Sequence, residues 1–294
     1  MNKRKQTATV LAFLAAVLYA LNAPLSKLLL HRIAPTMMAA FLYLGAGLGL
    51  LLVSLVGRLR GKPIHEQPLT VKELPFTVGM ILLDITAPIS LMVGLTMTTA
   101  ANASLLNNFE IVATSLIALF LFRETISRRL WCAIALVTLA SLLLSFEDMS
   151  SFSFSYGSLF VLLACIFWGF ENNCTRKLSA KDPTQIVTIK GLGSGMGSLL
   201  AALLLSESLP AVPLILGALA LGFVAYGLSI YCYIYAQRDL GAAKTSAYYA
   251  VAPFVGAALS LLIFTEWPSP LFLAALAVMM LGTYFAVTDS TEAS

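Results

Sequence analysis

Long apolar segments recur along the whole chain, and they decide what it can fold into. Ten of them, each close to the length that a helix needs to cross a bilayer, are separated by short polar loops. Only 11% of the residues are charged, against about a quarter in ordinary soluble domains. We therefore expect an all-α integral membrane protein. Its ten transmembrane helices are predicted at residues 7–30, 36–57, 74–96, 99–122, 130–146, 156–177, 184–206, 213–236, 242–264 and 270–288.

A sequence repeat divides the chain into two halves. Residues 192–200 reproduce the glycine pattern of residues 44–52 at a spacing of 148 residues. A second match, between residues 119–124 and 261–266, follows in the same order at a spacing of 142 residues. Two matches in the same order indicate a duplication. The sequence therefore predicts a first five-helix repeat at 1–148 and a second at 149–294.

The distribution of loop charge predicts the orientation. Fifteen of the 18 lysines and arginines lie at the N-terminus or in loops that follow even-numbered helices. Because positively charged loops stay on the cytoplasmic side, we expect both termini to be cytoplasmic, in a cell inner (cytoplasmic) membrane. Five helices are an odd number, so the second repeat must enter the bilayer from the opposite side. The prediction is two inverted-topology repeats of five, which are typical of alternating-access carriers.

Three carboxylic acids within the expected spans are candidates for function. A charge there costs about 2.5–3.5 kcal/mol on insertion scales, so each acid should face a cavity or a partner. Asp84 and Glu110 are expected near the midplane, whereas Glu171 lies nearer to the end of its span and could reach the interface. Each acid could contact a substrate, carry a coupling proton, or be a hydrogen-bonded structural group.

Polar and aromatic side chains at helical spacing add candidates on six spans. Asn107, Glu110 and Thr114 form one stripe, and the repeat aligns Tyr249 and Ala252 with its first two positions. Such convergence predicts a central substrate cavity, although a stripe can also hold helices together. The expected substrate-binding residues are Tyr19, Asn22, Asp84, Asn107, Glu110, Trp168, Glu171, Tyr226, Tyr248 and Tyr249.

One base and three prolines complete the unusual residues of the spans. Lys190 is expected six residues inside the cytoplasmic end of its span. Its long stem can carry the ammonium group to the headgroups, so we expect it to snorkel. Pro24, Pro88 and Pro253 each remove one backbone hydrogen bond from an expected helix, and they could be hinges or static bends.

Short motifs give the chain a likeness to a known family. They are Phe122-Arg123-Glu124, Phe264-Thr265-Glu266, Phe167-Trp168-Gly169 and Ala252-Pro253-Phe254. With ten helices in two inverted halves, the chain resembles the drug/metabolite transporter (DMT) superfamily, and most closely its EamA-type bacterial members. The resemblance covers essentially the whole chain. It implies export of small metabolites, often amino acids and their relatives.

The acids and aromatic residues favour a small, amine-bearing substrate, held by carboxylate pairing and cation–π contact. No phosphate-binding loop occurs, so ATP is not expected to drive transport in this chain. Protons are a candidate coupling ion, and facilitated diffusion is equally compatible. The alternative within the superfamily is a lipid-linked or nucleotide-type metabolite flippase or carrier.

An intramembrane enzyme is disfavoured. The chain has two histidines, His31 and His65, and they are expected on opposite sides of the membrane. Neither a cofactor, a metal nor a nucleic-acid partner is expected. The expected partners are the small-molecule substrate, protons as a possibility, and the lipid bilayer, with monomer and homodimer both open.

Overall fold

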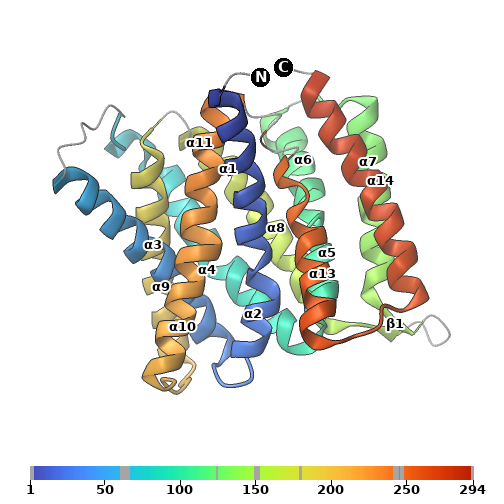
Figure 1. Cartoon of the computed structure of the whole chain (residues 1–294), viewed down its shortest axis with the longest axis horizontal. Coiled ribbons are helices and arrows are strands. Elements are labelled where there is room, and N and C mark those ends of the chain that lie inside the picture. The colour runs from blue at the N-terminus through green and yellow to red at the C-terminus, as the bar shows by residue number, and fades with distance from the viewer. Residues whose placement is uncertain are drawn as a thin grey trace.

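The computed structural model of the chain describes residues 3–59, 67–123, 125–148, 153–178, 181–240, 245 and 248–292. Within these residues, nine helices are long and apolar enough to cross a membrane, and Ala252–Phe264 is a shorter apolar helix. The helices stand side by side in one bundle (Figure 1). The predicted all-α membrane fold with ten spanning segments is confirmed. Glu124 and His65 lie outside the described residues.

The first half contains α1 (Lys3–Ala20), α2 (Asn22–Leu29), α3 (Pro35–Leu59), the 3₁₀ turn η1 (Val71–Glu73), α4 (Leu74–Met97), α5 (Ala100–Leu106), α6 (Phe109–Phe122) and α7 (Arg128–Ser145). An antiparallel hairpin of β1 (Phe146–Asp148) and β2 (Ser153–Phe154) follows. The second half contains α8 (Tyr156–Leu178), α9 (Pro183–Leu204), α10 (Val212–Gly222), the π-helical segment η2 (Phe223–Leu228), α11 (Ser229–Leu240), α13 (Ala252–Phe264) and α14 (Pro270–Glu292). The predicted boundary between residues 148 and 149 falls between β1 and β2, where residues 149–152 lie outside the described part.

Helices of the two halves pack in repeat-related pairs. α3 packs against α9 and α7 packs against α14, and each pair joins the equivalent helices of the two halves. α4 packs against α8, and the helices that the repeat relates to them, α11 and α1, also pack together. Exchanging the halves therefore maps this packing onto itself, as an inverted repeat requires.

The repeated glycines lie where α3 and α9 meet their neighbours. A Cβ added at Gly45 would lie 2.1 Å from the carbonyl oxygen of Leu219 on α10. The repeat-related Gly193 faces α4, where an added Cβ would lie 2.8 Å from Cδ1 of Ile81. Both distances are too short for real atoms, so glycine is what permits these close approaches.

Three spans are interrupted inside the bundle. α1 ends before α2 at Leu21, α5 is separated from α6, and the helical turn that contains Tyr248–Tyr249 ends before α13. Pro24 and Pro253 follow two of these breaks closely, and each lacks the N–H that would bond to the carbonyl four residues earlier. Pro88, in contrast, lies inside the uninterrupted α4. Main-chain hydrogen bonds bridge the break between α5 and α6, such as the one from the N–H of Glu110 to the carbonyl oxygen of Asn107.

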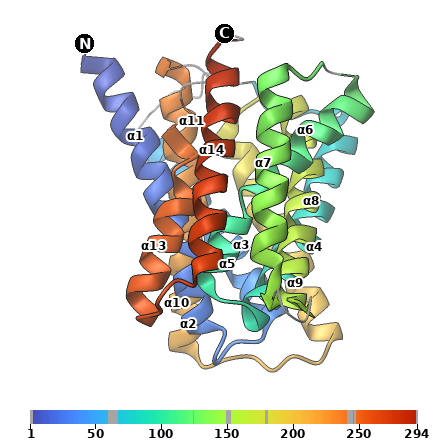
Figure 2. The same cartoon turned by 90° about the vertical axis from the view of Figure 1, so that its right-hand side faces the viewer.

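Both chain ends lie at one end of the bundle, which we call the terminal face (Figures 1 and 2). β1 lies at the opposite end, the hairpin face (Figure 1). This arrangement fits an even number of spans.

The predicted orientation can be tested with single cysteines in a variant that lacks the four natural ones. One cysteine would replace Gln67, which is exposed near the start of α4, and the other would lie in the linker at 147–155. With a membrane-impermeant thiol reagent on intact cells, we expect the linker cysteine to react and Gln67→Cys to stay unlabelled, because positive loops remain inside. The reverse labelling would contradict cytoplasmic termini.

Candidate functional site

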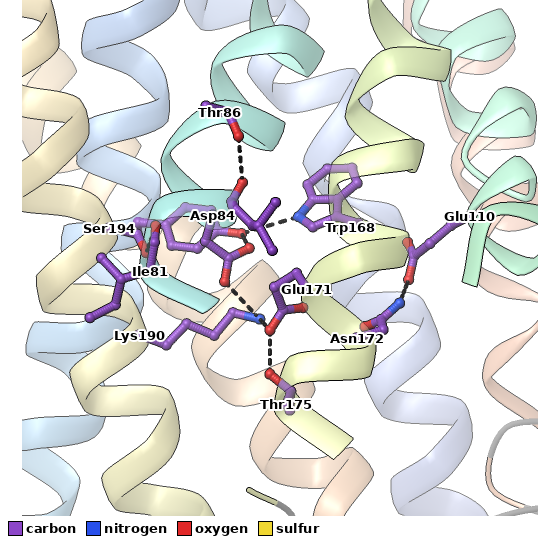
Figure 3. A network of polar contacts seen from close by, with 12 residues as sticks. Ile81, Asp84, Thr86, Glu110, Trp168, Glu171, Asn172, Thr175, Lys190 and Ser194 are labelled. Atoms are coloured by element: carbon purple, nitrogen blue, oxygen red, sulfur yellow. Dashed lines mark hydrogen bonds and ion pairs between the residues drawn. The ribbon is translucent and has the colours of Figure 1, made fainter. Parts of the chain in front are cut away.

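A buried ion-pair cluster joins three helices in the half of the bundle nearer the terminal face. Nζ of Lys190, on α9, lies 3.0 Å from Oδ2 of Asp84 on α4 and 3.0 Å from Oε1 of Glu171 on α8 (Figure 3). The exposed fraction of the side chain is 0% for Asp84, 2% for Glu171 and 14% for Lys190. Two carboxylates and one ammonium thus share a site that bulk water hardly reaches, and we call it the lysine triad.

Two hydroxyl groups donate to the carboxylates of the triad. The hydroxyl of Tyr43, on α3, donates to Oδ1 of Asp84 at 2.9 Å. The indole Nε1 of Trp168 donates to that hydroxyl at 3.4 Å, and the hydroxyl of Thr175 donates to Glu171. Each buried carboxylate therefore has both an ionic and a hydrogen-bonded partner, which is what a buried charge needs in order to remain ionised.

The expectation that Lys190 snorkels to the headgroups is wrong, and Glu171, for which an interfacial position was an open alternative, is a buried, ion-paired acid. The contact between α9 and α4 turns Lys190 inward, because Ser194, one turn later, donates to the carbonyl oxygen of Ile81 at 3.2 Å (Figure 3). That contact brings Lys190 beside Asp84. Two carboxylates at 3.0 Å offset the cost of taking the ammonium out of water.

Glu110 belongs to a second polar cluster, between α6 and α8. The amide nitrogen of Asn172 donates to Oε1 of Glu110 at 2.6 Å and to Oγ1 of Thr114 at 3.2 Å (Figure 3). All three side chains stay partly exposed although they lie in membrane-spanning helices. Glu110 is therefore the least buried of the three predicted acids.

Aromatic residues connect the two halves beside these clusters. The amide nitrogen of Asn22 donates to the hydroxyl of Tyr226 at 2.9 Å. The ring of Tyr226 lies 5.2 Å from that of Tyr43 and 5.8 Å from that of Tyr19, between ring centroids. Tyr249 lies 5.8 Å from Tyr19. Tyr43 thus touches both the lysine triad and the tyrosines.

A small cavity lies where the interrupted spans meet, and we call it the break cavity. It leaves about 10 Å³ for the centre of a water molecule, which is room for about one water-sized group. Among the described residues, Oδ1 of Asn107 and Oγ of Ser104 are buried there without a hydrogen-bond partner. The carbonyl oxygen of Ala20 and Oγ of Ser104 also lie 3.2 and 3.0 Å from the point that a Cβ on Gly256 would occupy. Its lining residues are Tyr19, Ala20, Asn22, Ala23, Ser104, Asn107, Ala252, Pro253 and Gly256.

Not every predicted residue joins these clusters. Tyr248 packs against Phe13 with ring centroids 4.9 Å apart, and 41% of Phe13 is exposed on the outside of the bundle. Asn107 lines the break cavity rather than sharing the Glu110 cluster, because it lies between the end of α5 and the start of α6. The described residues contain no group of three His, Cys, Asp or Glu side chains that could hold a metal ion.

Sequence reasoning missed Tyr43 and Asn172. Tyr43 is the only polar side chain between Thr36 and Ser54 in an otherwise apolar helix, and that isolation was a usable signal. Asn172 stands directly after Glu171, and neighbours point about 100° apart on a helix, so the two could have been assigned to different partners.

The fold and these clusters define a multi-pass membrane protein of the transporter class, with repeated halves and interrupted helices around intramembrane ionisable groups. The chain belongs to the EamA-like transporter family, whose model matches residues 6–146 and 155–288. The predicted resemblance to EamA-type members of the DMT superfamily is thereby confirmed.

Two individual proteins illustrate the likeness. An uncharacterized transporter of Methanothermobacter thermautotrophicus is 27% identical over 274 residues, which cover 86% of this chain and 78% of that protein. A protein of known crystal structure is 20% identical, covers 95% of both chains and superposes with a TM-score of 0.67. The second comparison establishes a shared fold.

Proposed function

We propose that the protein is a secondary carrier that exports small amine-bearing metabolites, such as amino acids or their relatives, by alternating access. The observation that carries this proposal is the meeting of three interrupted spans, from both halves, beside intramembrane acids. Carriers with inverted repeats commonly bind their solutes at such interruptions near the midplane. We place the protein in the inner membrane with both termini in the cytoplasm, and protons are a candidate coupling ion.

The ends of the interrupted helices favour a solute with both charges. α1 ends at Ala20. Its carbonyl oxygen lacks the usual helical hydrogen bond, because Pro24, four residues later, has no N–H. The C-terminal end of a helix attracts a cation, and the start of α13 at Ala252 offers the opposite polarity. An amino acid carries an ammonium and a carboxylate a few atoms apart, so it can use both ends. Glu110, with its partly exposed carboxylate, adds a second partner for the ammonium.

The lipid-linked flippase alternative is less well supported. A lipid phosphate would need an unpaired cation in the membrane-spanning part. Lys190 carries two carboxylates at 3.0 Å, so it offers no net positive charge to a phosphate.

Transport by purified protein in lipid vesicles tests the proposal. We expect uptake and efflux of at least one amine-bearing solute in a screen over amino acids, polyamines and nucleosides, run with and without a pH gradient. Transport of nucleosides alone, or of none of these solutes by correctly folded protein, would contradict it.

Gly256→Ala tests whether the break cavity takes part in transport. The added methyl would fill the space beside Ser104 without removing any polar group. Overpacking of this kind costs about 1–3 kcal/mol, so we expect the transport rate to fall by about tenfold or more. The control is Gly217→Ala, whose Cβ would meet its nearest neighbour at 4.0 Å. Equal rates for the two variants would remove the cavity from the transport path.

A further inference from the structure

Two carboxylates of the lysine triad form a binding position for a primary ammonium group, and the ammonium of Lys190 occupies it. Asp84 and Glu171 come from different helices, and both point their carboxylates at one nitrogen (Figure 3). Tyr43 donates to Oδ1 of Asp84 and leaves Oδ2 to the ammonium, whereas Thr175 and Lys190 share Oε1 of Glu171. With both acids ionised, the triad keeps one net negative charge, so it is selective for cations.

We propose that the carboxylates of Asp84 and Glu171 form a site for the ammonium group of the transported solute, and that Lys190 fills this site only between transport events. This inference rests on the proposed function, and it adds the triad to the end of α1 and Glu110 as a partner of the solute's ammonium. Lys190 is then a tethered competitor of the solute. It leaves the carboxylates when a solute amine enters and returns when the solute departs.

The side chain of Lys190 can reach a second position outside the triad. Lys190 is the eighth residue of α9, which begins at Pro183, so its Cα lies about 10 Å from the start of the helix. The four-carbon stem is flexible, and 14% of the side chain is already exposed. A lysine at this depth can swing its ammonium towards the headgroups. The position near the headgroups that the sequence predicts for the ammonium of Lys190 would thus be a second position of this side chain, taken up when it leaves the triad.

Because the two acids are buried, we expect the ammonium of Lys190 to be exchanged for another cation rather than simply to leave. Asp84 is fully buried and Glu171 is 2% exposed, so a departure of Lys190 alone would leave two uncompensated charges. Such states are strongly disfavoured. The arrival of another cation removes that penalty, so movement of Lys190 becomes coupled to solute binding.

The geometry also sets the kind of cation. A primary ammonium has three N–H donors and can reach both carboxylates at hydrogen-bond distance, as Lys190 does. A quaternary ammonium has no N–H and is too wide for the same position. We therefore expect primary amines to be preferred over quaternary ones.

Chemical rescue tests the site directly. In Lys190→Ala, the stem and the ammonium are removed and a space for a small amine remains. We expect the melting temperature of the purified variant to fall, and methylammonium chloride to restore at least half of the loss. Tetramethylammonium chloride at the same concentration should restore none of it. Failure of methylammonium to stabilise the folded variant would overturn the proposal.

Lys181→Ala is the matched control, because Lys181 pairs with Glu73 at 3.5 Å with both side chains partly exposed. Its melting temperature, like that of the unaltered protein, should not respond differently to the two ammonium salts. A methylammonium effect of equal size in the control would show a general salt effect and would overturn the assignment.

A second variant covers the case in which Lys190→Ala does not fold. Lys190→Arg keeps the charge, and its planar guanidinium can pair with both carboxylates more rigidly than an ammonium. We expect the variant to fold, and the half-saturating concentration of a transported amine to rise by about tenfold or more, because the competitor leaves less readily. An unchanged half-saturating concentration would overturn the role of Lys190 as a competitor.

The outcomes separate the two proposals. Rescue by methylammonium in a protein that transports no amine-bearing solute would support the ammonium site and refute the proposed function. Transport of an amine by a protein that shows neither the rescue nor the Lys190→Arg effect would support the function and refute the site.

Discussion

Glu110→Gln is expected to lose most transport while the fold stays nearly intact. The substituted amide keeps an oxygen that can accept from Asn172, and a neutral amide is easier to bury than a carboxylate. What disappears is the charge that would pair with a solute amine or carry a coupling proton. A hydrogen bond to a charged group contributes about 1.5–3 kcal/mol, so transport should fall by about ten- to a hundredfold.

Counterflow in vesicles distinguishes the two roles of Glu110. A residue that only carries the coupling proton can be dispensable for exchange of solute across the membrane, whereas a binding residue is required. The control is Glu266→Gln, an exposed acid at the end of α13. If Glu110→Gln kept the transport rate, affinity and pH dependence of the parent protein, Glu110 would be a structural acid. The Glu110 cluster would then be only a contact between helices.

Gly45→Ala is expected to destabilise the protein more than any other single methyl addition discussed here. The new Cβ would lie 2.1 Å from a main-chain oxygen, that of Leu219, and main chain cannot move aside as a flexible side chain can. Overpacking at this level costs about 3 kcal/mol, which corresponds to a fall in Tm of roughly 5–10 °C for a chain of this size. Thermal unfolding of purified protein, followed by circular dichroism, measures it.

Gly57→Ala, in the same helix, provides the comparison. Among the described residues, no atom beyond the neighbouring backbone of its own helix lies within 4 Å of a Cβ added there. Alanine is the better helix former, so this variant should keep the parent Tm or exceed it slightly. Similar melting temperatures for Gly45→Ala and Gly57→Ala would show that α3 and α10 do not pack this closely.

Much of the architecture could be predicted from the sequence because the bilayer imposes it. Span length and the repeat are visible in the apolar pattern, and two of the three helix interruptions have a proline beside them. The interruption between α5 and α6 has none, since Asn107 and Asn108 mark it instead. No local rule makes two asparagines end a helix, so the chain as a whole was needed to reveal it.

The direction in which a side chain points was the harder problem. A membrane helix is apolar on all sides, so its pattern does not say which face turns to the neighbours. Tyr248 and Tyr249 show the consequence, because adjacent residues point about 100° apart on a helix and only Tyr249 reaches the tyrosines. The direction of the Lys190 side chain was predicted wrongly for a related reason. Its partners lie on two other helices, and only the packing of α9 brings the three together.

The lysine triad also has a consequence for how the chain is made. Asp84 is synthesised 106 residues before Lys190, which at about 5–20 residues per second is an interval of about 5–20 s. During that time the ribosome delivers α4 to the bilayer with an acid that has no cation, and α8 follows with another. The nascent first half therefore carries an acid whose cationic partner arrives only with α9. Folding and insertion of the two halves are therefore linked, because Asp84 of the first half finds its cation only in the second half.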